Sequence, residues 1–141
     1  MGTTVFGWRV LSLSGKTRPG RFDEEVPAEL IELWQVCGGA RLFTDVDYGQ
    51  WGLVLLGPEV SWRRTLDQLD LPPADRRPGD VVIGEFLGDL DLLIYAPTEA
   101  GESRILVSLP LDPRDDWYAV GSSLEEFLVR YVDNQGEKFW M

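Results

Sequence analysis

The carboxylate residues of this chain are the first candidates for chemistry, because they are numerous and closely spaced. Its 141 residues include 24 Asp and Glu against 13 Lys and Arg, a formal net charge of −11. Three groups of aspartates fall at predicted turns and loops: Asp45 and Asp47, Asp89 and Asp91, and Asp112, Asp115 and Asp116. Paired carboxylates perform acid–base catalysis when burial separates their pKa values, and they also bind Ca²⁺ or Mg²⁺.

Neither kind of site has a specific signature in this sequence. Asp45, Asp47 and Gly49 do not match a calcium-binding loop, which needs ligands at alternate positions and a glutamate at the twelfth. With so many acids in the chain, clusters also arise by chance. A solvated surface is therefore the first interpretation, a partner-binding face the second, and catalysis or metal binding the third. We expect no enzymatic activity, no metal and no cofactor.

The other residue types that carry catalysis are scarce. The chain has no histidine and one cysteine, which excludes a Ser-His-Asp triad, a Cys-His pair, a His-ligated or Cys₄ zinc site and an internal disulfide. Cys37 falls at the end of a predicted helix, where neither a histidine nor a helix N-terminus would activate it, so we expect an inert buried thiol. Gly38-Gly39 follows that helix, as a C-cap does, whereas a phosphate-binding turn precedes one.

Charge is distributed unevenly along the chain. Residues 1–21 hold four basic and no acidic residues, a balance of +4, whereas residues 22–141 hold nine basic and 24 acidic ones, a balance of −15. The first segment is predicted to be a basic strand and loop, which either lies on the acidic body or acts as an independent tail. The acidity opposes direct nucleic-acid binding, which depends on Lys and Arg. No apolar run approaches the roughly 18–20 residues that span a membrane, and no secretory signal is recognisable, so we expect a cytoplasmic protein.

Hydrophobic spacing and turn residues predict the elements that must position these side chains. Helices are predicted over 27–37, over 59–69 with Val60, Leu66 and Leu69 facing inward, and after a capping Ser122 or Ser123 paired with Glu125 or Glu126. Strands are predicted over 5–13, 51–56, 81–87, 90–95, 104–109 and 117–120. Strands grouped between helices indicate a single α+β domain over residues 1–141. The closing Phe139-Trp140 is expected to pack back on the body.

Several short motifs follow one another in a set order along residues 25–132. They are Pro-Ala-Glu-Leu-Ile-Glu-Leu-Trp before Gly38-Gly39 and Leu42-Phe43, Trp51-Gly52-Leu53, Val82-Ile83-Gly84-Glu85-Phe86, Leu92-Leu93-Ile94-Tyr95, and Trp117-Tyr118-Ala119-Val120 before Ser-Ser-Leu-Glu-Glu-Phe-Leu. In this order they resemble the SUKH superfamily, which includes yeast cell-wall regulators of the Smi/Knr type and many bacterial proteins. The usual lead-in of the family, a helix before a Leu-Pro pair, is replaced here by the strand-like stretch from Phe6 to Leu13 and by Val26-Pro27.

The resemblance implies a SUKH-like α+β fold with a mixed, mostly antiparallel sheet flanked by helices. For a bacterial member it also implies an immunity protein that binds and neutralises a cognate toxin, often a nuclease, and it transfers no catalytic residue. An acidic face suits a basic toxin domain. The hypothesis therefore assigns partner binding to seven aspartates: Asp45, Asp47, Asp89, Asp91, Asp112, Asp115 and Asp116.

Two alternatives to this hypothesis remain open. One is an intracellular regulator or scaffold of the Smi/Knr type that has no toxin partner. The other is an enzyme that uses paired carboxylates. The sequence leaves five points open. They are the identity of the partner, the surface that binds it, the oligomeric state, the role of the basic N-terminal segment and the presence of a small-ligand pocket on the sheet.

Overall fold

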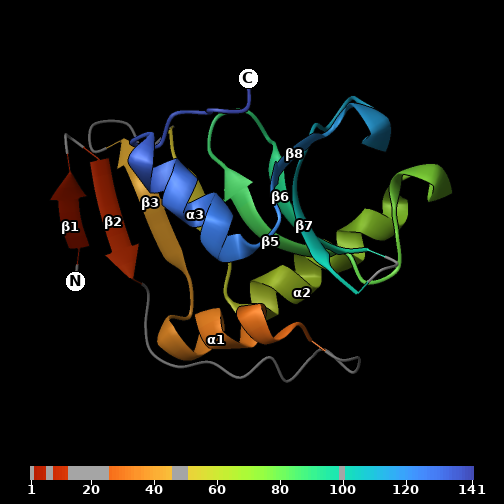
Figure 1. Ribbon diagram of the computed structural model, residues 1–141, viewed down its shortest axis with the longest axis horizontal. Coiled ribbons are helices and arrows are strands. Elements are labelled where there is room, and N and C mark those ends of the chain that lie inside the picture. The colour runs from red at the N-terminus through yellow and green to blue at the C-terminus, as the bar shows by residue number, and fades with distance from the viewer. Residues whose placement is uncertain (1, 6–7, 13–25, 46–50, 99–100) are drawn as a thin grey trace.

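The structure, a computed structural model, describes residues 2–5, 8–12, 26–45, 51–98 and 101–141. In this part of the chain eight strands form one sheet in sequence order, and every neighbouring pair is antiparallel (Figure 1). The strands are β1 (Gly2–Val5), β2 (Trp8–Ser12), β3 (Ala40–Asp45), β4 (Leu53–Leu55), β5 (Val81–Phe86), β6 (Leu92–Pro97), β7 (Ser103–Ser108) and β8 (Tyr118–Gly121). The predicted single α+β domain is confirmed, but the sheet is antiparallel throughout the described strands and not mixed, because each strand pairs with the next one along the chain.

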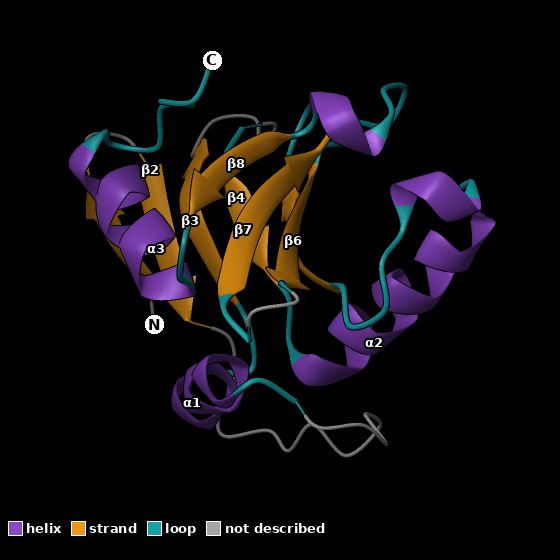
Figure 2. Ribbon diagram, turned by 45° about the vertical axis from the view of Figure 1, so that its right-hand side comes forward, coloured by secondary structure: helices purple, strands orange, loops and turns teal. Residues whose placement is uncertain are grey.

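Helices cover both faces of the sheet. The α-helices are α1 (Ala28–Val36), α2 (Pro58–Asp67) and α3 (Leu124–Asp133), and the 3₁₀ turns are η1 (Gln68–Asp70), η2 (Pro73–Asp75) and η3 (Arg114–Asp116). Figure 2 shows α3 and α2 on opposite sides of the sheet, with α1 below it. The three predicted α-helices therefore exist, with ends close to those expected.

Two hydrophobic cores form because successive strand side chains point to opposite faces. On β5, Ile83 enters the larger core and its neighbour Val82 enters the smaller one. The larger core receives Trp34 from α1 and Phe127 from α3, and both side chains are fully buried. The smaller core lies on the α2 side of the sheet and is partly covered by Trp117.

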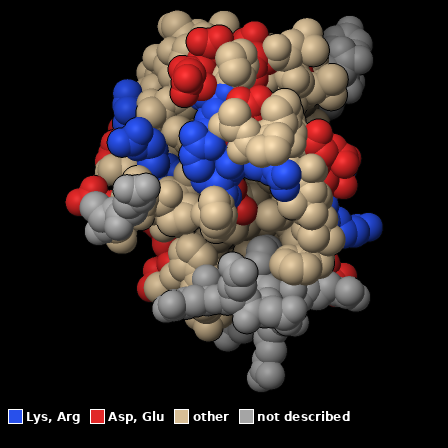
Figure 3. Space-filling view, turned by 90° about the vertical axis from the view of Figure 1, so that its right-hand side faces the viewer, with Lys and Arg blue, Asp and Glu red and all other residues tan. Residues whose placement is uncertain are grey.

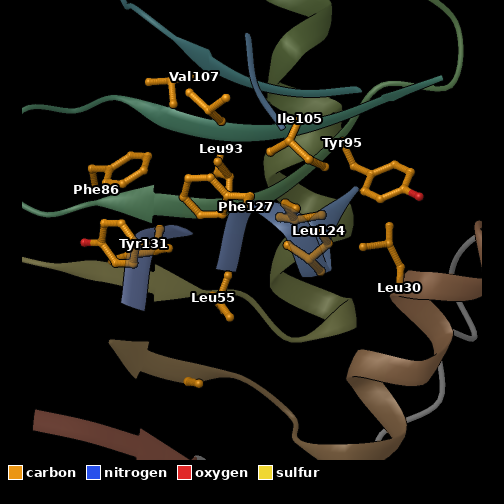
Figure 4. Packing of buried hydrophobic residues seen from close by; sticks show 14 of the residues in the cluster. Leu30, Leu55, Phe86, Leu93, Tyr95, Ile105, Val107, Leu124, Phe127 and Tyr131 are labelled. Atoms are coloured by element: carbon orange, nitrogen blue, oxygen red, sulfur yellow. The ribbon is translucent and has the colours of Figure 1, made fainter. Parts of the chain in front are cut away.

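Aromatic rings fill the larger core beside α3 (Figure 4). Phe127 and Tyr131 stack with ring centroids 5.5 Å apart, and Trp140 lies 5.4 Å from Phe86. Phe139 and Trp140 pack against each other and against Phe127, so the predicted return of the C-terminal residues to the body is confirmed. Burial raises the pKa of the Tyr131 hydroxyl well above its ordinary value.

The first turn of α3 is capped from two sides. The Ser123 hydroxyl accepts a hydrogen bond from the Glu126 backbone N–H at 3.0 Å, which confirms the predicted capping serine. The Glu29 carboxylate on α1 accepts from the backbone N–H groups of Leu124, at 2.7 Å, and Glu125, at 3.0 Å. Because Glu29 lies 95 residues from Leu124 in sequence, this second cap ties α1 to α3.

Helix α2 packs through Val60, as predicted, and through hydroxyl groups in place of the two leucines that were also predicted to face inward. Leu66 and Leu69 are exposed. Ser61 donates its hydroxyl to the Val82 carbonyl at 2.6 Å, and the Val82 N–H donates to the Thr65 hydroxyl at 3.0 Å. Strand β4 is only three residues long and ends before it reaches Val82, so the two hydroxyls satisfy backbone groups that no strand pairs on that side.

The N-terminal part of the sheet differs from the prediction in two places. A single strand was predicted over 5–13, whereas the structure has the hairpin β1–β2 with its turn outside the described residues. Strand β3 was not predicted. Phe43 in its middle has a left-handed φ of 54°, and Phe43 and Thr44 are both buried, so β3 lacks the alternation by which a strand is recognised.

Candidate functional site

Two acidic groups of the sequence, and Asp45 of the third, belong to one end of the sheet. In an antiparallel sheet of sequential strands, the end of β3 lies at the same end of the sheet as the β5–β6 and β7–β8 connections. Helix α1 leads into β3 at the opposite end, where Ala40 pairs with Leu55. Figure 1 accordingly shows the β5–β6 turn and the β7–β8 loop at the top and α1 at the bottom. Asp45 is the last residue of β3, and Asp47 lies outside the described residues.

Asp89 and Asp91 in the β5–β6 turn are held by the C-terminal tail. The Lys138 ammonium forms an ion pair with the exposed Asp89 carboxylate, and its Nζ lies 3.5 Å from Asp91 Oδ2. Asp91 is only 8% exposed. The same ammonium lies 5.4 Å from the centroid of the Phe86 ring. The structure therefore places Asp91 inside the protein, where it cannot meet a partner directly.

Asp91 should make stability depend on pH in a direction that is unusual for an aspartate. Burial raises the pKa of its carboxyl above the ordinary value, and the Lys138 ammonium opposes the rise. The folded state thus binds a proton more readily than the unfolded state, so the contribution of Asp91 improves as the pH falls through the folded pKa. We expect the D91N variant to be at least as stable as the wild type at pH 7 and to lose this advantage by about pH 4.

Urea unfolding of both proteins at several pH values measures this difference. The D89N variant is the matched control, because it also removes a Lys138 contact but at an exposed carboxylate. A D91N variant that is clearly less stable than the wild type at pH 7 and catches up in acid would show that attraction to Lys138 outweighs desolvation.

The β7–β8 connection, residues 109–117, is called the acidic loop below. Asp112, Asp115 and Asp116 are exposed in it, and none forms an ion pair within the described residues. Arg114, the loop's basic residue, turns inward to Asp80, with Nη1 2.5 Å from Oδ2 and Nη2 3.2 Å from Oδ1. The Arg114 and Asp80 side chains are 13% and 9% exposed. Asp80, which lies outside the acidic loop, thus neutralises the positive charge of Arg114. The three aspartates of the loop keep their negative charges.

Three further contacts order the acidic loop, one of them to Asp75 and two within the loop. The Arg114 backbone N–H donates to Asp75 Oδ1 at 3.0 Å, and the Trp117 indole N–H donates to the Asp112 carbonyl at 3.1 Å. The Arg114 guanidinium carbon also lies 5.3 Å from the centroid of the Trp117 ring. These contacts hold the exposed carboxylates of the loop on a preorganised backbone.

A groove of about 490 Å³ lies between the acidic loop, the β5–β6 turn and the segment from η1 to η2. We call it the leucine groove, because leucines and prolines form most of its lining: Leu71, Leu90, Leu92, Leu109, Leu111, Pro72, Pro110 and Pro113. Its charged lining residues are Asp75 and Asp112, and no Lys or Arg lines it. The groove joins apolar surface to negative charge, which is the combination a basic partner with an apolar anchor would fit.

Two leucines on the rim of this groove are unusually exposed. Leu111 is 95% exposed and Leu90 is 79% exposed. Leu90 also has a left-handed φ of 63°, a conformation that costs a non-glycine residue roughly 1–2 kcal/mol. An exposed side chain on strained backbone is not explained by packing, so this turn is a candidate for function.

A second groove, of about 1010 Å³, crosses β6, β7 and β8 on the α2 side of the sheet. Arg77, Arg104 and Arg114 line it together with Glu102 and Asp115. Figure 3 shows Lys and Arg gathered in the middle of this face and Asp and Glu beyond them. The acidic body therefore carries a basic patch, but the groove mixes both signs of charge and the Arg114 guanidinium is already bound by Asp80.

No group of three or more His, Cys, Asp or Glu that could hold a metal ion occurs among the described residues. Cys37 is buried at the end of α1, as predicted. No helix in the described ranges is long and apolar enough to cross a membrane.

The chain matches no family model, no curated protein and no solved structure. The resemblance to the SUKH superfamily therefore stays a prediction. The sequence reasoning found the acidic loop but missed the leucine groove. Leu90 directly after Gly88-Asp89, and Leu111 between Pro110 and Asp112, were the available signals, because a large apolar residue in a polar turn is unusual.

Proposed function

We propose that the chain is a cytoplasmic, non-enzymatic binding domain that recognises a basic protein partner through the acidic loop. In its sharper form the proposal is an immunity protein of the SUKH type that neutralises a bacterial toxin, such as a nuclease. The observation that carries it is the set of three aspartates without ion pairs among the described residues, on a loop fixed by Arg114 and Trp117.

The geometry of the loop favours binding in two ways. A preorganised loop loses little conformational freedom on association, so more of the interaction energy is left for affinity. Unneutralised carboxylates at one end of the molecule also attract a positively charged surface from a distance and raise the association rate. A nuclease binds phosphates with such a surface, and a bound acidic loop would cover it.

The seven aspartates of the sequence hypothesis contribute unequally to this proposal. Asp112, Asp115 and Asp116 form its centre. Asp89 lies nearby with its charge partly neutralised by Lys138, and the burial of Asp91 removes it from the binding set. An intracellular regulator or scaffold of the Smi/Knr type would use the same surface without a toxin, and it is the second candidate.

The proposal predicts that reversing the charge of the acidic loop weakens binding to the toxin encoded beside this chain's gene. The D112K/D115K/D116K variant should lose about tenfold to a hundredfold in affinity, mostly through slower association, and its remaining affinity should depend less on salt. Surface plasmon resonance at two salt concentrations measures both effects, and growth of cells that express the toxin measures protection.

The E32K/D133K/E137K variant is the matched control, because it reverses three exposed acids on other parts of the surface. Equal losses in both triple variants would mean that net charge, and not the acidic loop, governs the interaction. If the neighbouring gene product binds neither the wild type nor the control, the proposal of an immunity protein is wrong. That result would favour the regulator or scaffold of the Smi/Knr type.

A further inference from the structure

We infer that the leucine groove holds one large apolar side chain of the partner, carried on a segment in which Lys or Arg flanks that side chain. The inference rests on the proposed function, and it adds a chemical description of what the partner presents.

The lining of the groove selects an apolar group. Its volume of about 490 Å³ lies within the range of about 300–1,000 Å³ in which proteins bind small ligands, so it has room for one large side chain. Leu92 and Leu109 line it with the prolines, and Trp117 contributes an aromatic side chain. Apolar surface of this kind gains free energy in proportion to the area that a guest removes from water.

The rim of the leucine groove carries backbone strain and exposed apolar surface, and neither stabilises the fold. Leu90 keeps a left-handed backbone although glycine, which adopts that conformation freely, would satisfy the same turn. Its side chain is mostly exposed, and Leu111 on the other side of the groove is exposed almost completely. A partner side chain between them would remove both leucines from water.

The charges decide which partner fits. Asp75 and Asp112 line the leucine groove, Asp116 follows on the acidic loop, and no basic residue lines the groove, whereas Asp115 lines the second groove. Basic residues on both sides of an apolar anchor would therefore meet carboxylates. A second copy of this chain is a poor occupant, because its own exposed Leu111 is followed by Asp112 and would bring like charges together.

The probe for this inference is a synthetic peptide, Gly-Lys-Arg-Leu-Phe-Lys-Arg-Gly, titrated into protein labelled with 5-fluorotryptophan. Two control peptides replace Leu-Phe by Ser-Ser or all basic residues by Glu. The fluorine signal of Trp117, which lines the groove, should shift saturably with the first peptide at about 1 mM and with neither control. The signal of Trp34, buried in the other core, should not move.

Three variants locate the contact. L90G and L111S should each lower the affinity for the peptide by about fivefold or more. V36S changes an equally exposed apolar residue at the end of α1 and should leave that affinity unchanged. L90G also relieves the strained backbone, so it should fold at least as stably as the wild type. Lost binding in L90G is then not a consequence of unfolding.

Each outcome has a defined meaning. A peptide that leaves Trp117 unmoved, or that binds L90G and L111S as tightly as the wild type, overturns the inference. Toxin binding that is lost in D112K/D115K/D116K but kept in both groove variants preserves the proposed function and also overturns the inference. Self-association that disappears in L111S would make a second copy the occupant and overturn it as well.

Discussion

Replacing Arg114 with methionine is expected to lower the free energy of unfolding by about 3 kcal/mol. The change leaves the Asp80 carboxylate, which is 9% exposed, without its cation, and removing one partner of a buried ion pair typically costs about 3–5 kcal/mol. One compensating contact remains, because the Arg77 backbone N–H still donates to Asp80 at 3.1 Å. The expected cost therefore lies at the lower end of that range.

Urea unfolding measures this cost, and two further variants show where it comes from. R104M removes an exposed arginine that lines the second groove together with Arg114, and it should cost less than about 0.5 kcal/mol. Adding D80N to R114M removes the unpaired negative charge of Asp80, so it should recover part of the lost free energy of unfolding. If R114M is as stable as R104M, the Arg114–Asp80 pair does not hold the acidic loop in place.

The same substitution links stability to the proposed function. Where R114M is still folded, the acidic loop loses its attachment to Asp80 but keeps all three exposed aspartates. Electrostatic attraction should therefore persist, so the association rate of a basic partner should change little and its dissociation should become faster. The opposite pattern, slower association and unchanged dissociation, is expected for the charge-reversal variant.

Elements whose signals are local in the sequence were predicted well. Helix α3 combines a capping serine with an apolar stripe, and its cap at Ser123 was found where expected. The strands from β5 to β8 were found with ends shifted by one or two residues, because short apolar runs between turns mark them clearly. Helix α2 was placed correctly and Val60 packs inward as predicted, but the hydrogen bonds of Ser61 and Thr65 to the β5 backbone were not predicted.

The candidate site was predicted only in outline, for the same reason. The charge of the acidic loop is visible in the sequence, but the inward turn of Arg114 depends on Asp80, 34 residues away. The pairing of Lys138 with Asp89 and Asp91 spans 47–49 residues. The leucine groove is assembled from three segments that are separate in the chain, and no periodicity connects them.

Replacing Gly57 with alanine is expected to cost about 3 kcal/mol, although alanine suits the backbone there. Gly57 has an ordinary φ of −71°, so its conformation does not call for glycine. A Cβ at this position would lie 2.0 Å from the Gly38 carbonyl oxygen, a backbone atom that cannot rotate away. Relief requires the end of α1 and the start of α2 to move apart, and forcing extra atoms into close-packed structure costs about 1–3 kcal/mol or more.

Thermal or urea unfolding tests this prediction against G101A. Gly101 has a positive φ of 79° but nothing within 4 Å of an added Cβ, so this control carries conformational strain without a clash and should cost about 1 kcal/mol. A G57A loss no larger than that of G101A would show that the two backbone segments separate easily. Because α2 leads directly into the η1–η2 side of the leucine groove, folded G57A protein should also show a shifted Trp117 fluorine signal, whereas G101A should not.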